Sequence, residues 1–313
     1  MVPTAPSSLK HFHAMPRLPA WLARRDVDDS SAGLPRLTAS AAATDPQHAV
    51  SLLRESGAVR IDNVLSKQTC KALHAHSIDS LATALAEVKA HRTAASDVFA
   101  EHLLIGEQAN KRHDVKLSLK SPTVQHAVRE VLQSLHAIFV QSLGADAELF
   151  ELSSITSEVG TPAQTPHADF AAWPDDEDCP GQMVVVCFIA LTDLKPRMGP
   201  THFRPGSHTR AFHSDGAAAS SASCEDLSTS AYCAPLLKAG DAVLMDSACF
   251  HAGGANTLRS RTVFHVSFAR GGFKPRGFDR FAQSLEGESG VGEGGGGRVR
   301  RRLDEAESWL GEG

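Results

Sequence analysis

The chain has 313 residues, of which 42% are hydrophobic and 21% charged, as in globular proteins that bury a sizeable core. Its formal net charge of −5 lacks the basic excess that is typical of nucleic-acid-binding proteins. Its longest apolar run, residues 183–191, is much too short to span a bilayer. We therefore expect neither nucleic acid nor a membrane as a partner, and the composition leaves the oligomeric state unknown.

The cysteines and the amino terminus bear on the cellular location. The six cysteines are scattered and form no C-x-x-C pair, which favours reduced thiols in a cytoplasmic protein. Residues 1–25 contain no long apolar stretch of the secretory type. They do carry basic and no acidic side chains, which leaves organelle targeting open.

Composition divides the chain into three parts. Residues 1–46 are rich in Pro, Ser, Ala and Thr, which predicts a flexible leader. Residues 286–297 are rich in glycine and predict a flexible linker, so 286–313 form a Gly-rich tail with room for one short helix. We expect one folded domain between them, at residues 47–285.

The first half of this domain has helical periodicity. One helix is expected after Ser66 as N-cap, with apolar residues at helical spacing as far as Val88. A second is expected after Ser121, with Pro122 in its first position and Gly144 as its stop. Two short apolar segments predict strands, at 57–61 and 115–119.

From Glu148 onward the sequence consists of short β-like segments separated by Gly, Pro and Asp. Strands are expected at 150–156, 183–191, 242–245 and 262–268. Helices followed by many short strands predict an α+β protein with a mainly β core, packed by amino-terminal helices. A double-sheet jelly roll is the economical arrangement for such strands.

The most informative short motif is His167-Ala-Asp169. Residues i and i+2 of a strand point to the same face, so this imidazole and this carboxylate can reach one metal ion. His251, which follows the predicted strand 242–245, is the candidate for a third ligand. Two histidines and one carboxylate that leave positions open are typical of non-haem Fe(II) oxygenases.

Arg261 lies ten residues after His251, at the start of a segment with period two. An oxygenase of this kind needs a co-substrate with a carboxylate far from iron, and arginine binds a carboxylate with two parallel hydrogen bonds. The alternatives are that Arg261 forms a surface ion pair, or that Arg259 has this role.

Four segments occur in a characteristic order along the chain. They are His167-x-Asp169, the run Gly199-Pro-Thr-x-Phe-x-Pro-Gly-Ser-His208, Gly240-Asp-Ala-Val243, and His251-Ala-Gly-Gly-Ala-Asn256 followed by Arg261. Together they resemble the phytanoyl-CoA dioxygenase family of Fe(II)- and 2-oxoglutarate-dependent oxygenases, over residues 48–275 or so. The resemblance implies a double-stranded β-helix (a cupin-like jelly roll) that uses 2-oxoglutarate and O₂ as co-substrates.

The resemblance also implies roles for individual residues. His167, Asp169 and His251 would bind Fe(II), and Arg261 would hold the distal carboxylate of 2-oxoglutarate. Related halogenases lack the carboxylate, so Asp169 favours hydroxylation or desaturation over halogenation. Many relatives have a hydroxyl residue two positions after the distal histidine, whereas this chain has Gly253. Either another hydroxyl residue replaces it, with Thr201 and Ser267 as candidates, or Arg261 acts with less help.

Further candidates follow from their places in the sequence. Gln164 and Lys116 are candidates for contact with the co-substrate, with a turn residue and a solvated strand lysine as the plain alternatives. Phe170 and Trp173 are candidates for an apolar wall of the substrate pocket. Three other histidines are expected to be structural because the ligand set is complete: His202, His208 and His265. Two long segments without periodicity are expected to cover the entrance, at 171–181 and 214–230.

The sequence thus predicts an oxidoreductase that hydroxylates or desaturates a small organic molecule with release of succinate and CO₂, and needs no separate acid or base residue. Two alternatives stay open. A zinc hydrolase can use the same three ligands, but it leaves Arg261 unexplained. A binding protein on the same scaffold is the other, although all three ligands and the arginine are present. The sequence does not name the substrate.

Overall fold

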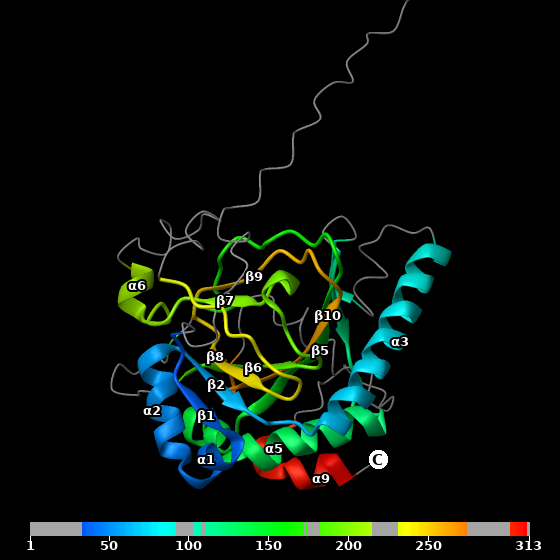
Figure 1. Ribbon diagram of the computed structural model, residues 1–313. Coiled ribbons are helices and arrows are strands. Elements are labelled where there is room, and N and C mark those ends of the chain that lie inside the picture. The colour runs from blue at the N-terminus through cyan, green and yellow to red at the C-terminus, as the bar shows by residue number, and fades with distance from the viewer. Residues whose placement is uncertain are drawn as a thin grey trace, which may run out of the picture.

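The centre of the fold is a large, mainly antiparallel β-sheet, seen in a computed structural model of the chain (Figure 1). The structure describes residues 33–91, 103–107, 111–171, 173, 182–214, 231–273 and 301–311. Among these, eight strands form the sheet, and only the β1–β2 pair is parallel. In sheet order they are β1 (Arg36–Thr38), β2 (Ala58–Asp62), β8 (Ala242–Asp246), β6 (Val184–Ala190), β10 (Arg261–Ala269), β5 (Glu148–Ser157), β4 (Arg112–Lys116) and β3 (Leu103–Glu107).

A second, two-stranded sheet packs over one face of the first. It pairs β7 (Thr201–Phe203) with β9 (His251–Gly253) in antiparallel register. Phe203 of β7 is buried among side chains of β6 and β8, so the two sheets face each other across a core. The predicted α+β fold with a jelly-roll core is confirmed.

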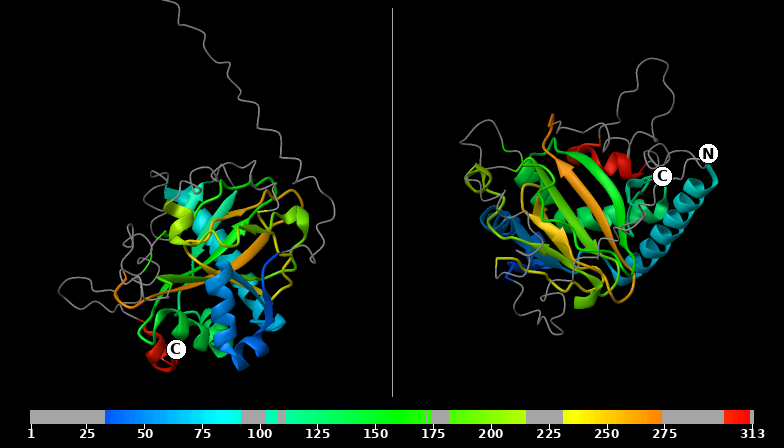
Figure 2. Two further views of the ribbon diagram at one scale, coloured as in Figure 1. Left: turned by 90° about the vertical axis from the view of Figure 1, so that its left-hand side faces the viewer. Right: turned by 90° about the horizontal axis from the view of Figure 1, so that it is seen from above.

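Helices cover the opposite face of the large sheet (Figures 1 and 2). Helix α5 (Pro122–Leu143) crosses this face and contacts α1, α2, β6 and β10. Helix α3 packs beside β4. The helices of this side are α1 (Ala39–Thr44), α2 (Pro46–Ser56), α3 (Lys67–His91), α5 (Pro122–Leu143) and α9 (Ala306–Gly311). The short helix α6 (Arg210–Ser214) lies apart from them, beside the small sheet (Figure 1), where Phe212 packs on Phe250. Two 3₁₀ turns are at Pro196–Met198 and Leu303–Glu305.

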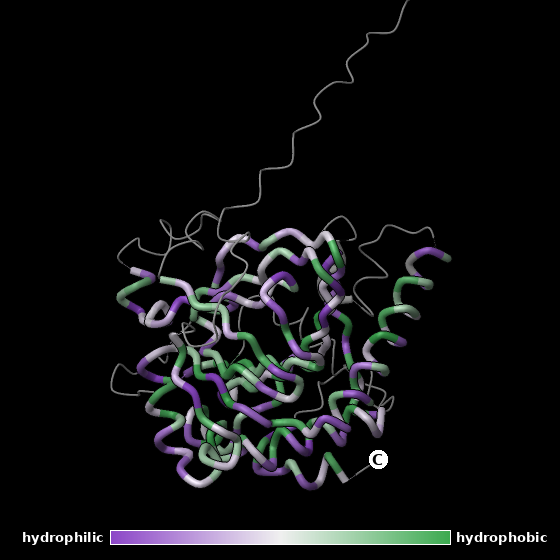
Figure 3. The backbone as a smooth tube through the Cα atoms, in the orientation of Figure 1, coloured by the Kyte–Doolittle hydropathy of each residue, from purple (hydrophilic) through white to green (hydrophobic). Residues whose placement is uncertain are grey.

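Alternate residues of the same strands fill two separate cores, because successive side chains of a strand point to opposite faces. Val185 and Ile189 of β6 pack toward the helices, whereas Val184 and Val186 pack toward the small sheet. Hydrophobic segments accordingly run through the middle of the molecule (Figure 3). The sheet is therefore buried on both faces along β6, which fixes its register.

Both predicted helices are present, as α3 and α5. The hydroxyl of Ser66 accepts a hydrogen bond from the N–H of Thr69, as an N-cap does, whereas the side chain of Ser121 makes no capping bond. All the predicted strands are present with small shifts at their ends. The largest shift is in β4, which begins at Arg112 instead of at residue 115, and this brings Arg112 and Asp114 into the sheet.

The fold extends beyond the limits that composition suggested. β1 and α1 precede residue 47, and Ala42 of α1 is fully buried in the main core. At the other end Trp309 and Leu310 are buried in the same core, and Arg129 donates a hydrogen bond to the carbonyl of Leu310 at 2.8 Å. A few large side chains are enough to attach these short segments, although they are too few to give a periodic pattern.

Parts of the expected organisation lie outside the described residues, among them 1–32 and 274–300. The expected covering segments, 171–181 and 214–230, lie almost wholly outside them as well. In the part of the chain that the structure describes, no helix combines the length and the apolar character that a membrane crossing requires.

Candidate metal centre and co-substrate cavity

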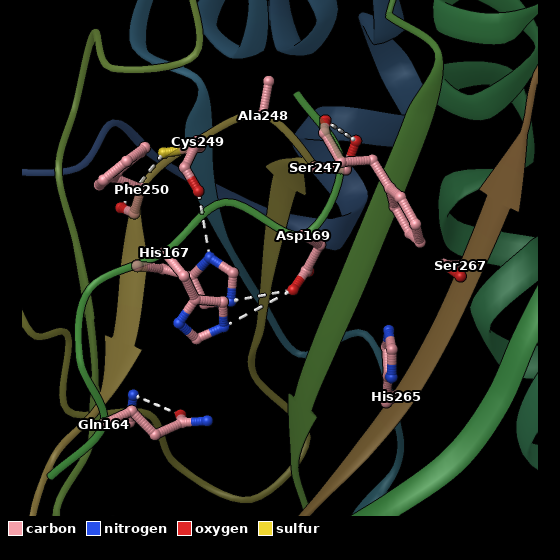
Figure 4. A network of polar contacts seen from close by, with 12 residues as sticks. Gln164, His167, Asp169, Ser247, Ala248, Cys249, Phe250, His265 and Ser267 are labelled. Atoms are coloured by element: carbon pink, nitrogen blue, oxygen red, sulfur yellow. Dashed lines mark hydrogen bonds and ion pairs between the residues drawn. The ribbon is translucent and has the colours of Figure 1, made fainter. Parts of the chain in front are cut away.

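His167, Asp169 and His251 come together at the edge of the small sheet (Figure 4). Oδ1 of Asp169 lies 3.7 Å from Nε2 of His167 and 3.7 Å from Nε2 of His251. One donor atom from each of the three residues lies within 4.8 Å of the others. This spacing allows one metal ion to contact all three.

The main chain fixes the separation of the two histidines. The N–H of each residue donates to the carbonyl of the other, over 3.0 Å from His167 and 2.8 Å from His251. This isolated bridge adds the segment of His167 to the edge of β9. The two rings consequently lie side by side, with their centroids 4.6 Å apart.

Hydrogen bonds also orient the imidazoles. Nδ1 of His167 lies 2.9 Å from the carbonyl of Thr165, and Nδ1 of His251 lies 3.1 Å from the carbonyl of Cys249. Because a carbonyl only accepts, both Nδ1 atoms are donors and both Nε2 lone pairs face Asp169. Burial lowers the pKa of His251, which keeps this ring neutral. Neutral imidazole is the form that binds metals.

The three donors open into a cavity of about 460 Å³, which is within the usual size of small-molecule sites. Apolar side chains form part of its wall, among them Phe170, Phe188 and Val263. Phe188 contacts the ring of His251, with centroids 6.0 Å apart. The cavity is therefore large enough for a co-substrate and a further small molecule.

Two guanidinium groups line the same cavity, that of Arg261 buried and that of Arg112 half-buried. Nε of Arg261 donates to the carbonyl of Met198 at 3.0 Å, and this side chain is almost fully buried. Nε of Arg112 donates to Oγ of Ser157 at 3.3 Å. Burial lowers the pKa of Arg261 to about 9, with the positive charge of Arg112 as the second cause, and burial lowers the pKa of Arg112 to about 10. Such depressed values indicate positive charges that an anion in the cavity would compensate.

Arg259, the other candidate for this role, is exposed on the surface. Its Nη2 lies 3.5 Å from the carbonyl of Asp193. It does not belong to the described lining of the cavity.

Gly253 explains the departure from the family pattern. A Cβ atom at this position would lie 2.8 Å from Nη2 of Arg112 and 2.8 Å from Oε1 of Gln164. Oε1 of Gln164 accepts a hydrogen bond from the N–H of Gly253 at 2.9 Å. The space that a hydroxyl residue would fill is thus taken by Arg112 and Gln164.

The secondary candidates divide into two groups. Gln164, Thr201 and Phe170 line the cavity. Lys116 and Trp173 are not among the described residues that line it. Nε1 of Trp173 instead donates to the carbonyl of His208 at 3.0 Å, because the chain has already turned away from the cavity there.

Three further residues that the sequence analysis named are Asn256, Ser267 and His265. The side-chain amide of Asn256 donates to the carbonyls of Ser157 and Arg259 and so fixes the glycine-rich turn. Ser267 donates to Glu151 at 3.2 Å. His265 was expected to be structural, but it lines the cavity, because it lies on the same face of its strand as Arg261.

Sequence reasoning missed three polar residues of the lining: Arg112, Asp114 and Glu151. Arg112 and Asp114 alternate with buried residues along β4, so a strand starting at residue 112 would have put both on one face. Glu151 is an acidic residue inside the apolar run of β5, and a buried charge of this kind is itself a signal of function.

A jelly roll that holds two histidines and a carboxylate beside two arginines in one cavity defines the class of non-haem iron enzymes that use 2-oxoglutarate. The chain belongs to the phytanoyl-CoA dioxygenase family, whose model matches residues 53–263. It is therefore an oxidoreductase of the Fe(II)- and 2-oxoglutarate-dependent type. No curated protein matches the chain.

Two solved structures are similar in fold. The non-haem α-ketoglutarate-dependent epimerase SnoN from nogalamycin biosynthesis is 20% identical, with a TM-score of 0.51 over 72% of this chain and 81% of SnoN. HygX from Streptomyces hygroscopicus, crystallised with nickel and 2-oxoglutarate, is 12% identical, with a TM-score of 0.52 over 72% of this chain and 88% of HygX. At these identities the likeness concerns the fold.

Proposed function

We propose that this protein oxidises an unactivated C–H bond of a small organic molecule, by hydroxylation or desaturation. In hydroxylation, the substrate, O₂ and 2-oxoglutarate give the hydroxylated product, succinate and CO₂. The single observation that carries the proposal is the joint position of the three donor residues and the two guanidinium groups around one cavity.

The donor set fits iron(II). Two imidazoles and one carboxylate on the same side leave coordination positions open for other ligands, as in non-haem iron oxygenases. His167, Asp169 and His251 would hold the metal. When bound there, iron(II) supplies the activation of O₂, coupled to the oxidative decarboxylation of 2-oxoglutarate.

Arg261 and Arg112 would hold the distal carboxylate of 2-oxoglutarate. Both are cationic and line the cavity, and an arginine fork matches a carboxylate with two hydrogen bonds. Thr201 and Gln164 lie in the same lining and would complete this end of the site. In a zinc hydrolase the two arginines would have no role, so this alternative is not favoured.

The apolar residues of the wall would shield the reaction from water. Phe170 packs edge to face on Phe150, with centroids 5.4 Å apart, which anchors it to the sheet. Phe188 stacks on His265 with centroids 5.0 Å apart. These contacts would keep the two phenyl rings in place. The rings would then contact the carbon skeleton of a substrate beside the donor residues and limit the access of solvent.

The test is anaerobic loading of the full-length protein with iron(II), followed by assay of bound iron and of succinate formed from 2-oxoglutarate in air. We expect about one iron per chain and succinate formation that depends on iron and O₂. Asp169→Ala and His251→Ala should lose iron binding and turnover while remaining folded. His126→Ala, whose side chain is 59% exposed on α5, is the matched control.

Iron binding without any succinate would favour the binding-protein alternative. Full activity in either of the two ligand variants would show that the assignment of the metal ligands is wrong.

A further inference from the structure

The cavity contains a second polar cluster that iron and 2-oxoglutarate do not explain. It consists of Asp114 on β4, Glu151 on β5 and His265 on β10, which we name the acidic wall. These strands are neighbours in the large sheet. Figure 4 shows His265 and Ser267 on their strand, to one side of Asp169.

Two serines connect the members of the acidic wall. Oγ of Ser153 lies 3.4 Å from Nδ1 of His265 and also bonds to the carboxylate of Asp114. The hydroxyl of Ser267 donates to Oε2 of Glu151 at 3.2 Å. Oε2 of Glu151 is 3.5 Å from Nε2 of His265. The three side chains thus form one connected group.

Two atoms of the acidic wall make no hydrogen bond with any described residue. They are Oδ1 of Asp114 and Nε2 of His265, on residues that are 9% and 5% exposed. Both residues line the cavity. A buried polar atom without a partner is costly, so its presence beside a cavity points to a ligand that supplies the partner.

The open atoms of the acidic wall are acceptors. An ionised carboxylate cannot donate, so the hydroxyl proton of Ser153 goes to Asp114, and Nδ1–H of His265 donates to Ser153. Burial lowers the pKa of His265 to about 4, so this ring is neutral and its Nε2 carries a lone pair. When Glu151 is ionised, as it would be beside a bound cation, its carboxylate adds a third acceptor, so the group that fits the acidic wall is a hydrogen-bond donor.

We propose that the acidic wall binds a protonated primary amine of the substrate that the metal centre oxidises. An ammonium group has three N–H donors, which matches the three acceptors, whereas a hydroxyl group has one. The apolar side chains of Phe188, Ile155 and Val263 would contact the carbon skeleton of such an amine. The inference rests on the proposed function and names its substrate class.

The charges of the site agree with a cationic substrate. Burial raises the pKa of Glu151 well above its usual range and that of Asp114 to about 6, and the charge of Asp169 adds to both shifts. Lys116, also on β4, is only a minor opposing influence on Asp114. An ammonium ion between the two carboxylates would relieve this cost.

The same charges disfavour other substrates. An anionic group would lie against two carboxylates, and a neutral alcohol would leave acceptors without a donor. Iron(II), Asp169, dianionic 2-oxoglutarate and the two arginines together carry a net charge of about +1. With both carboxylates of the acidic wall ionised, the whole site then carries one negative charge. A singly charged amine neutralises it.

The test compares primary amines with the alcohols of the same shape, from ethylamine and ethanol to cyclohexylamine and cyclohexanol. Binding is measured by calorimetry and by thermal shift on the full-length protein, loaded anaerobically with iron(II) and 2-oxoglutarate. At least one amine should bind more than tenfold more tightly than its alcohol.

Variants separate the acidic wall from direct binding of the amine to iron. Glu151→Gln and Asp114→Asn should each weaken amine binding about tenfold or more, with unchanged affinity for iron and 2-oxoglutarate. Glu148→Gln is the control, because Glu148 is on the same strand and outside the described lining of the cavity.

Equal binding of every amine and its alcohol would overturn the inference, as would amine binding that survives both variants. If the two variants do not fold, the comparison of amine with alcohol in the wild-type protein decides the question alone. Failure to bind iron or 2-oxoglutarate would count against the proposed function, and this is seen before any amine is added.

Discussion

Gly253 and Arg112 are complementary: a Cβ atom on the glycine would lie 2.8 Å from Nη2 of the arginine. The guanidinium therefore reaches the cavity only because residue 253 has no side chain. In this chain a second arginine takes the place where many relatives have a hydroxyl residue beside the co-substrate.

The first prediction concerns this pair. Gly253→Ser should displace Arg112 and raise the dissociation constant for 2-oxoglutarate about tenfold, even though it restores the residue type of many relatives. Calorimetric titration of the iron-loaded protein measures it. Gly311→Ser, at a position with no neighbour within 4 Å, is the control. The double variant Gly253→Ser/Arg112→Ala should bind more tightly than Gly253→Ser alone, and a purely additive loss would disprove the complementarity.

The second prediction concerns Arg261. A charge-assisted hydrogen bond to a carboxylate contributes about 1.5–3 kcal/mol. Arg261→Ala should therefore raise the 2-oxoglutarate requirement ~10- to 100-fold, at about 1.4 kcal/mol per tenfold change. Arg261→Lys should recover part of the loss, since lysine has the charge without the fork. Arg259→Ala, on the exposed side, is the matched control, and the assignment fails if it has the larger effect.

The third prediction concerns the carboxyl-terminal helix. Trp309 is 5% exposed, and its Nε1 donates to the carbonyl of Arg302 at 2.9 Å. Trp309→Ala should cost about 3 kcal/mol, within the range for large buried aromatic residues, and should lower the melting temperature by several degrees. Glu307→Ala, at an exposed position of the same helix, should change it little. An unchanged melting temperature for Trp309→Ala would show that 301–311 is dispensable.

The fourth prediction concerns pH. Burial raises the pKa of Asp246 to about 7, although its Oδ1 accepts a hydrogen bond from the N–H of Ala248. A carboxyl group whose pKa is raised in the folded state retains its proton there while the unfolded chain loses it. Its contribution to stability is therefore lost as the pH rises from about 4 to about 7.

Asp246→Asn should accordingly become more stable than the wild type above pH 7, by on the order of 1 kcal/mol, with little difference at pH 4. Urea unfolding at the two pH values measures this. A difference that is the same at both values would mean that Asp246 is ionised in the folded protein.

Much of the fold could be predicted from the sequence because it depends on local patterns. Alternation and turn residues marked β6 and β10, and a proline and a glycine marked the ends of α5. The close approach of His167 and Asp169 follows from their spacing. These features are determined by residues next to each other in the chain.

Other parts depend on contacts between distant segments. The sequence could not show that Arg112 reaches the cavity, since this depends on Gly253, a residue 141 positions away that leaves the space. Nor could it show that Trp309 packs on the core, because a long glycine-rich segment separates it from the domain. Burial of Glu151 opposes its ordinary preference for the surface, and this conflict marks the place where we infer function.

The reciprocal hydrogen bonds between His167 and His251 bear on the structure of the protein without iron. Because peptide groups, and not the ion, set the separation of the two imidazoles, the empty centre keeps its shape. A chelator should then remove the metal without melting the domain, and activity should return on adding iron(II) without any refolding step. The iron-free protein would therefore stay folded and ready to bind iron(II) when it becomes available.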